Sequence, residues 1–355
     1  MDFDGIPGLT SAINASLTEF FVRESRYLTQ IGSELEPVVD ALGHFLLDTG
    51  KRFRPLFAAI GYLGTGAELT PEIMHAVSSL ELIHVCALIH DDVMDGSDIR
   101  RGAPSIHKQF EALHAKNALH GSAHQFGVAS AILIGDLALI WAAKMFHESG
   151  APSRQILQAL PVYDEMRIEL MAGQYLDTFE QALASESVER SLKVARYKSG
   201  KYSIERPLHF GAMLSPEYTE AQLEIYSNYG LPLGEDFQLR DDIIGVFGDP
   251  SITGKPAGDD LREGKRTVLV ATTLTKSNAA ARSTFLRDFG RTELDLTQIK
   301  LMREIIVESG ALSELESLIE QMTSNARSAL TRGGITEPAV SLLDEMSVVA
   351  TSRNS

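Results

Sequence analysis

The sequence predicts an all-α fold, a single large bundle of about a dozen helices spanning residues 1–355. Apolar residues recur at helical spacing along most of the chain, whereas no convincing run alternates apolar and polar residues as a strand would. No Pro-rich or Gly/Ser-rich stretch separates two halves, and 44% hydrophobic residues in a chain of 355 are enough for one large core. We therefore expect one domain.

Capping and helix-breaking residues set the expected boundaries. Glycines and a proline make residues 1–9 a loose lead-in, and Thr70 followed by Pro71 marks the start of the fourth helix. The expected helices are 10–28, 33–47, 53–63, 70–95, 106–116, 127–148, 154–184, 187–199, 202–213, 219–246, 261–275, 279–288, 296–309, 312–331 and 337–347, with loops at 100–106 and 248–264 and a tail at 351–355.

Charge and composition exclude some classes of function. A net charge of −16 argues against a nucleic-acid partner, so an anion would have to be bound by a local basic cluster. The one cysteine, Cys86, excludes an intramolecular disulfide and suits the cytoplasm, and no signal peptide is expected. Asp136 and Lys144 interrupt the longest apolar run, residues 128–145, so we expect a buried core helix and no transmembrane segment.

The apolar helix before residue 95 ends in three carboxylates, those of Asp91, Asp92 and Asp95. Asp91 and Asp95 are four residues apart and share one helix face, with Asp92 on the same rim. Like charges this close repel one another and oppose the helix macrodipole, so a divalent cation would stabilise them. Ligands that are all oxygen favour Mg²⁺ or a similar hard ion that bridges to phosphate.

A second apolar helix closes on a pair of acids, Asp241 and Asp242. If the two acidic helix ends face each other across a cavity, roughly two or three Mg²⁺ ions held between them would bind a diphosphate. The alternative is that each cluster is an ordinary solvated helix end.

Basic residues recur near both clusters. Lys51 and Arg54 lie at the start of a helix, whose N-terminus favours anions. Arg100 and Arg101 follow the first cluster, and their planar guanidinium groups suit phosphate. The other candidates are His84, Lys198, Lys255 and Lys265. Any one of these cations alone would pass for a solvated surface residue, and His84 for a packed core residue.

With these motifs the chain resembles the trans-isoprenyl diphosphate synthases, or polyprenyl synthetases, over roughly residues 35–275. The matching segments are GKRFRP from Gly50, DDVMD from Asp91 with RRG from Arg100, GQYLD from Gly173, Lys198 with Ser199, and FQLRDD from Phe237 with GDP from Gly248 and GK from Gly254. The resemblance implies a helical bundle around a deep central cavity, in a homodimer.

The resemblance also implies roles for the matching positions. Mg²⁺, with Mn²⁺ as a substitute, would be held by Asp91, Asp92, Asp95, Asp241 and Asp242, with Asp260 nearby. Isopentenyl diphosphate would be bound by Lys51, Arg54, His84 and Arg101, and the allylic diphosphate by Arg100, Gln174, Lys198, Ser199, Gln238, Lys255 and Lys265. The residues taking part in catalysis would be Asp91, Asp92, Asp95, Arg100, Lys198, Gln238, Asp241 and Lys255.

The reaction that the resemblance implies is head-to-tail condensation of isopentenyl diphosphate with dimethylallyl, geranyl or farnesyl diphosphate. Metal ions and cationic side chains would stabilise the departing pyrophosphate, so no protein nucleophile is needed. The chain departs from the family at Gly245, where the second DDxxD motif often has its third aspartate. This departure leaves the number of metal ligands there open.

Small side chains before the first cluster favour a longer product. Cys86 and Ala87 stand where an aromatic residue closes the product pocket early in this family, so the pocket would continue past Ile83 to Ser79 and Leu80. We expect mainly the C20 product, geranylgeranyl diphosphate, with some C15. The alternatives are a longer-chain synthase, a class I terpene synthase and a non-catalytic partner subunit. A terpene synthase would not need the basic motifs of a second diphosphate site.

Overall fold

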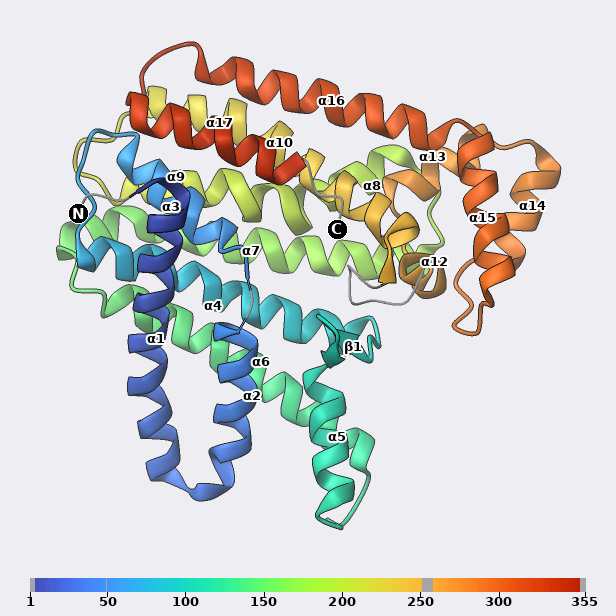
Figure 1. The fold of residues 1–355 in the computed structure, drawn as a ribbon, viewed down its shortest axis with the longest axis horizontal. Helices are drawn as coiled ribbons and strands as arrows, with labels where there is room; N and C mark the ends of the chain where they lie inside the picture. The colour runs from blue at the N-terminus through green and yellow to red at the C-terminus, as the bar shows by residue number, and fades with distance from the viewer. Residues whose placement is uncertain (1–3, 49, 251–257, 352–355) are drawn as a thin grey trace. The chain divides into compact units, whose positions relative to one another are not determined.

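In the computed structural model the described residues are 4–48, 50–250 and 258–351, and the fold is all-α as predicted (Figure 1). Within these ranges one small antiparallel hairpin, β1 (Ile99–Arg100) with β2 (Ala103–Pro104), forms the only sheet. The chain divides into two compact units, both discontinuous in sequence. The expected single domain therefore remains a prediction.

Unit 1 comprises residues 1–162, 207–219 and 336–342. Its elements are α1 (Gly5–Ile31), the 3-10 turn η1 (Ser33–Leu35), α2 (Glu36–Leu47), α3 (Phe53–Leu63), α4 (Pro71–Met94), the β-hairpin, α5 (Ile106–Lys116), α6 (Ala123–His147), the beginning of α7 (Ser153–Leu183) and most of α9 (Arg206–Met213).

Unit 2 comprises residues 163–206, 220–335 and 343–355. Its elements are the remainder of α7, α8 (Val188–Val194), the π-helix η2 (Ala195–Glu205), α10 (Glu220–Phe247), α12 (Asp259–Glu263), α13 (Val268–Lys276), α14 (Ala279–Asp288), α15 (Leu296–Glu308), α16 (Ala311–Leu330) and the end of α17 (Glu337–Thr351).

Helix α4 is the central helix of unit 1 and packs against α1, α2, α3, α5 and α6. It begins as predicted, with Pro71 as its first residue and the Thr70 hydroxyl accepting a hydrogen bond from the Ile73 amide at 3.4 Å. Its buried side chains lie all around the helix rather than on one face, as in helices enclosed by neighbours. The acidic residues at its C-terminus are therefore carried by a firmly packed helix.

Helix α10 has the corresponding role in unit 2, where it packs against η2, α12, α13 and α16. Leu239, Ile243 and Val246 join an apolar cluster with buried side chains of α13, α15 and α16. The second acidic cluster is thus also carried by a helix whose other faces are held in a core.

Several predicted boundaries at helix ends are wrong. Helix α1 begins at Gly5, because Leu9, only 1% exposed, extends its buried apolar row by one turn. Helix α6 begins at Ala123, where the Ser122 side chain accepts a hydrogen bond from the Gln125 amide. Helix α17 continues to Thr351, where a tail was expected.

Two internal boundaries also differ. The break expected between residues 199 and 202 is absent, because α8, η2 and α9 follow one another from 188 to 213 with π-helical geometry in the middle. Conversely, the helix expected at 261–275 is divided into α12 and α13, and Gly264 ends α12 with a φ of 72° that favours glycine.

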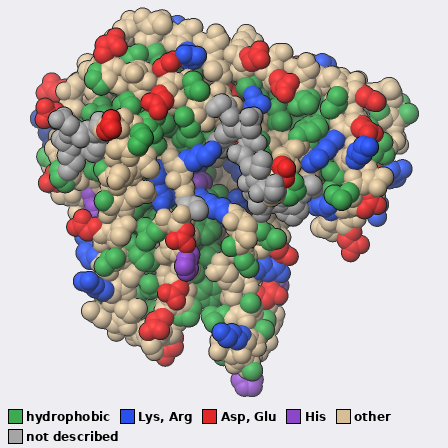
Figure 2. Space-filling view, viewed as in Figure 1, with side chains coloured by type: hydrophobic (Ala, Val, Ile, Leu, Met, Phe, Trp, Pro, Cys, Tyr) green, Lys and Arg blue, Asp and Glu red, His purple; other side chains and the backbone are tan. Residues whose placement is uncertain are grey.

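Helix α6 is only partly buried, although we expected a buried core helix. Figure 2 shows apolar and charged side chains scattered over the face in view, and single exposed apolar residues of this kind are common in proteins. On α6, however, Phe126, Leu133 and Ile140 follow at heptad spacing and are 37%, 68% and 63% exposed. By length and composition alone, α4 and α6 are both apolar enough to cross a membrane, a criterion that core helices also meet. Of the 18-residue stretch that meets this criterion, 72% is buried in α4 and 39% is buried in α6.

Candidate active site

The first acidic cluster lies at the C-terminal end of α4. Asp91 and Asp95 are one turn apart, and the Asp95 amide donates to the Asp91 carbonyl at 2.8 Å. Asp92 is buried, with 1% of its side chain exposed, whereas Asp91 is 16% exposed. Asp91 is therefore more open to a ligand than Asp92.

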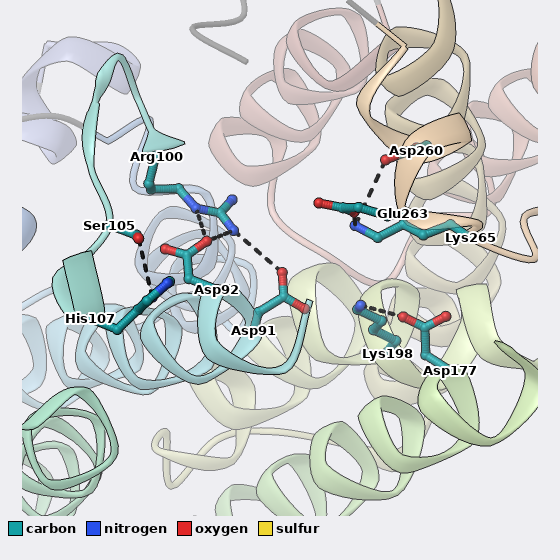
Figure 3. A network of polar contacts seen from close by, with 10 residues as sticks. All are labelled: Asp91, Asp92, Arg100, Ser105, His107, Asp177, Lys198, Asp260, Glu263 and Lys265. Carbon is teal, nitrogen blue, oxygen red and sulfur yellow. Dashed lines mark hydrogen bonds and ion pairs between the residues drawn. The ribbon is translucent and has the colours of Figure 1, made fainter. Parts of the chain in front are cut away.

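Arg100, on β1, covers this cluster with its guanidinium group (Figure 3). Its Nε donates to Asp92 Oδ1 at 2.8 Å, and its Nη2 contacts the same oxygen and Asp91 Oδ2, the latter at 3.4 Å. Burial opposes the charge, but the fields of Asp92 and Asp91 raise the pKa of Arg100 above its ordinary value. Asp92 thus holds Arg100 in place beside Asp91.

The basic residues of unit 1 gather around His84. Burial depresses the pKa of His84 well below 6.5, and the charges of Arg54, Arg101, Arg100 and Arg52 depress it further. The imidazole is therefore neutral at pH 7, in a strongly positive environment. Three residues predicted to bind isopentenyl diphosphate, Arg54, His84 and Arg101, are brought together, and Lys51 is exposed at the same end of α3.

The second acidic cluster lies near the C-terminal end of α10. Gln238 connects two of the predicted residues, because it accepts from the Ser199 hydroxyl and donates its Nε2 to Asp242 Oδ1 at 2.8 Å. Burial raises the pKa of Asp242 to about 8; the Gln238 hydrogen bond opposes this, and the charges of Asp260, Asp241 and Asp177 reinforce it. These carboxylates therefore share one strongly negative environment in unit 2.

The structure gives a reason for glycine at position 245. A Cβ atom added to Gly245 would lie 2.0 Å from Asp260 Oδ2 and 2.4 Å from its Cγ. The carboxylate of Asp260, from α12, occupies the space into which a side chain at 245 would extend. The buried carboxylate of Asp260 therefore joins Asp241 and Asp242 in this cluster.

Two lysines predicted to bind the allylic diphosphate hold carboxylates in unit 2 (Figure 3). Lys198 Nζ lies 2.6 Å from Asp177 Oδ2, and Lys265 Nζ lies 2.8 Å from Glu263 and 3.7 Å from Asp260. Gln174 is on α7, one turn before Asp177. Lys255, predicted as a further cation of this set, lies outside the described residues.

Within the described ranges, no three His, Cys, Asp or Glu side chains converge into a preformed metal cage. The donors still fit Mg²⁺, because this ion typically uses only one or two carboxylates and completes its octahedron with water and substrate phosphate. Asp91 and Asp95 offer such a pair in unit 1, and Asp241 and Asp260 offer carboxylates in unit 2.

A family model for polyprenyl synthetases matches residues 36–306. The chain belongs to the polyprenyl synthetase family. It is thus a prenyltransferase of a metal-dependent family that acts on isoprenyl diphosphates.

Similar proteins carry several product names. A geranylfarnesyl diphosphate synthase from Aeropyrum pernix is 33% identical over 294 residues, covering 81% of this chain and 85% of that protein. A nonaprenyl diphosphate synthase from Mycobacterium tuberculosis is 32% identical over 245 residues, covering 68% and 64%. A crystal structure of a geranylgeranyl pyrophosphate synthase from Corynebacterium glutamicum, complexed with isoprenyl diphosphate and magnesium, has a TM-score of 0.94 at 38% identity, covering 99% of this chain and 100% of that one.

The predicted chain-length residues of this synthetase lie along α4. Ser79, Ile83 and Cys86 are fully buried, as is Leu80, whereas Ala87 is half-buried. Cys86 Sγ lies 3.7 Å from Nδ1 of His90, which itself contacts α6; burial raises the pKa of the Cys86 thiol to about 12. Cys86 therefore belongs to the packing between α4 and α6, and Ala87 is the more accessible of the two.

The π-helical geometry of η2 was not expected from the sequence. It carries Lys198 and Ser199 past two glycines of neighbouring helices. A Cβ on Gly173 would lie 2.3 Å from the Lys198 amide nitrogen, and one on Gly234 would lie 2.4 Å from the carbonyl oxygen of Gly200. The wide π-helix thus fits only because its neighbours lack side chains there. The glycine of the GQYLD segment was a signal for this close approach.

Proposed function

We propose that the chain is an all-trans isoprenyl diphosphate synthase that condenses isopentenyl diphosphate head to tail with an allylic diphosphate. The observation that carries the proposal is the pairing, within unit 1, of an acidic helix end with a separate group of cations around the neutral His84. The acidic end suits a metal-bound diphosphate, and the cations suit a diphosphate without metal. A class I terpene synthase needs only the first of these two sites.

In this proposal, Asp91 and Asp95 in unit 1 and Asp241 in unit 2 would hold Mg²⁺, roughly two or three ions in all, and the bound metal would supply electrostatic stabilisation to the departing pyrophosphate. Arg100, Lys198 and Lys265 bind the allylic diphosphate. Each of them holds a carboxylate in this structure, so the cation that each contributes is already oriented.

The side chains of Ser199 and Gln238 present their dipoles toward the allylic carbon, where positive charge develops. The cations around His84 hold isopentenyl diphosphate, whose alkene attacks the allylic carbon, and the released pyrophosphate takes up the proton that the condensed product loses. Excluding water from the site protects the allylic cation.

For the product we propose mainly geranylgeranyl diphosphate. Ala87 on α4 is small and half-buried, and the Corynebacterium glutamicum structure carries the name of a geranylgeranyl pyrophosphate synthase. Ala87→Phe should shorten the product, whereas Cys86→Phe should mainly disturb the packing of α4 on α6. An unchanged product distribution in a folded Ala87→Phe variant would place the floor of the pocket elsewhere.

The direct test is to incubate the protein with Mg²⁺, isopentenyl diphosphate and dimethylallyl, geranyl or farnesyl diphosphate in turn, and then to size the products. Mainly C20 alcohol after dephosphorylation supports the proposal. Products of C40 or more would instead make it a longer-chain synthase, and hydrocarbon formed without isopentenyl diphosphate would indicate a terpene synthase. No turnover of any primer would favour a non-catalytic subunit.

We also propose a cytoplasmic homodimer in which the exposed row of α6, Phe126, Leu133 and Ile140, forms part of the interface. Exposed apolar side chains that recur along one helix are typical of surfaces that bind protein. Leu133→Asp with Ile140→Asp should convert the dimer into a monomer, as measured by sedimentation velocity. If the wild-type protein is monomeric at micromolar concentration, this proposal is wrong.

A further inference from the structure

Arg52, one of the cations of the GKRFRP segment, directs its side chain into the protein. Its side chain is only 2% exposed, and its guanidinium group donates three hydrogen bonds. The acceptors are Asn14 Oδ1 at 2.8 Å, Glu81 Oε1 at 2.8 Å and the Leu46 carbonyl at 2.7 Å. They come from α1, α4 and α2 respectively, so this arginine connects three helices and is not available to a substrate.

The backbone around Arg52 is unusual, and it lies close to the ion pair with Glu81. Arg52 has a φ of 51°, a left-handed conformation that residues other than glycine seldom adopt. A Cβ on Gly50 would lie 2.7 Å from Arg52 Nη1 and 3.2 Å from Glu81 Oε1. Glycine at position 50 therefore allows the chain to close over the ion pair immediately before α3 begins.

Glu81 also influences Arg101, another cation of the group around His84. Within the described ranges its Oε2 is buried and has no hydrogen-bond partner. Burial lowers the pKa of Arg101, and the charge of Glu81 is the strongest influence opposing it. One buried carboxylate thus bonds to Arg52 directly and attracts Arg101 electrostatically.

We propose that the buried pair Arg52–Glu81 is a positioning device for the isopentenyl diphosphate site. It fixes Lys51 and Arg54 on one side, through the backbone of the segment that carries them, and Arg101 on the other, through the charge of Glu81. A buried ion pair is poor evidence of stability in itself, because apolar side chains of similar size often replace one without loss. The inference rests on the proposed function, since it assigns the pair to one of the two substrates.

The test is the double substitution Arg52→Met with Glu81→Met, which removes both charges and keeps an apolar core. Thermal unfolding monitored by circular dichroism should show that the variant folds. Steady-state kinetics should show KM for isopentenyl diphosphate raised by at least about tenfold, while KM for farnesyl diphosphate changes by less than about threefold. Binding of isopentenyl diphosphate alone, measured by calorimetry, should weaken to the same extent.

A control removes another ion pair of unit 1, in which only the carboxylate is buried. Glu24 is 3% exposed, and its Oε2 lies 2.8 Å from Lys144 Nζ. Glu24→Met with Lys144→Met should leave both KM values within about twofold of the wild type. Arg52→Lys provides a milder variant, because lysine keeps the charge but lacks the fork that reaches Asn14 and the Leu46 carbonyl. It should raise KM for isopentenyl diphosphate by an intermediate factor.

The proposal is overturned if Arg52→Lys or the double variant folds and binds isopentenyl diphosphate like the wild type. It is equally overturned if both KM values rise together, since that result indicates general damage. If wild-type protein neither binds isopentenyl diphosphate nor turns it over, the proposed function itself fails, which is a separate outcome.

Discussion

The two acidic helix ends have the same sequence pattern but different surroundings. At the end of α4, Arg100 lies against Asp92 and Asp91, so part of the negative charge is balanced by the protein itself. At the end of α10, Asp242 is buried among other carboxylates, and burial raises its pKa to about 8. A bound cation would therefore change the energy of the second cluster more than that of the first.

The difference teaches that charge repulsion alone does not identify a metal site. In the first cluster, hydrogen bonds from Arg100 hold the carboxylates in place. In the second cluster, the arrangement of the carboxylates is set by Asp260, which fills the space beside Gly245. The residues that shape each cluster belong to the same unit as the cluster itself.

The largest effect is expected from removing one carboxylate of either cluster. Asp91→Ala and Asp241→Ala should each lower kcat/KM by at least about 1,000-fold, because both are proposed to hold the ions that stabilise the leaving pyrophosphate. Circular dichroism and thermal unfolding provide the control for folding. Magnesium with pyrophosphate should raise the Tm of the wild type but not of these variants. Turnover like that of the wild type in either variant would show that its cluster is not a metal site.

The next prediction compares two positions, 245 and 260, from which a third carboxylate can be supplied to the acidic cluster of unit 2. Gly245→Asp should lower kcat by roughly 10- to 100-fold, because the new side chain would enter the space of the Asp260 carboxylate. Asp260→Gly should be similarly impaired. The double variant Gly245→Asp with Asp260→Gly restores one carboxylate to one space, and its kcat should exceed that of both single variants. A double variant worse than either would mean that Asp260 acts for another reason.

A smaller effect tests whether Asp92 of unit 1 holds Arg100 in place or binds the metal directly. Asp92 is buried and occupied by Arg100, so Asp92→Asn should lower kcat/KM by roughly 10- to 30-fold, well below the loss for Asp91→Ala. The main change should be a higher KM for the allylic substrate, since the orientation of Arg100 is lost. Equal losses in the two variants would instead make Asp92 a direct ligand.

Much of the fold follows from local signals in the sequence. The start of α4 was predictable because Thr70 and Pro71 act on their own helix, and both acidic helix ends follow from apolar periodicity that stops at paired aspartates. The gathering of Arg54 and Arg101 around His84 was expected only through the family resemblance.

Other features depend on residues far apart in the chain, and the sequence pattern does not contain them. The π-geometry of η2 requires glycines on α7 and α10, and the burial of Arg52 requires acceptors from three helices. The exposed row of α6 was missed because periodicity says which side chains are apolar, not what covers them.

The last contrast concerns stability rather than turnover and involves another buried acid of α10, Asp236. It is fully buried, and Thr323 Oγ1 donates to its Oδ2 at 2.5 Å. Burial raises the pKa of Asp236 from 3.8 to about 6, against the hydrogen bond of Thr323 and the charge of Arg240. Between these two values the folded protein holds a proton that the unfolded chain releases, so this residue lowers the stability as the pH rises from about 4 to about 6.

Asp236→Asn should therefore stabilise the protein at pH 8 by up to about 3 kcal/mol and have little effect at pH 4, because asparagine stays neutral and still accepts from Thr323. Asp92→Asn should do the opposite at pH 8, since it leaves Arg100 without its main partner. Urea unfolding of both variants at pH 4, 5, 6 and 8 measures this contrast. If both variants lose stability at pH 8, the Asp236 carboxylate is stabilised as a charge, and the two acidic helices are more alike than their surroundings indicate.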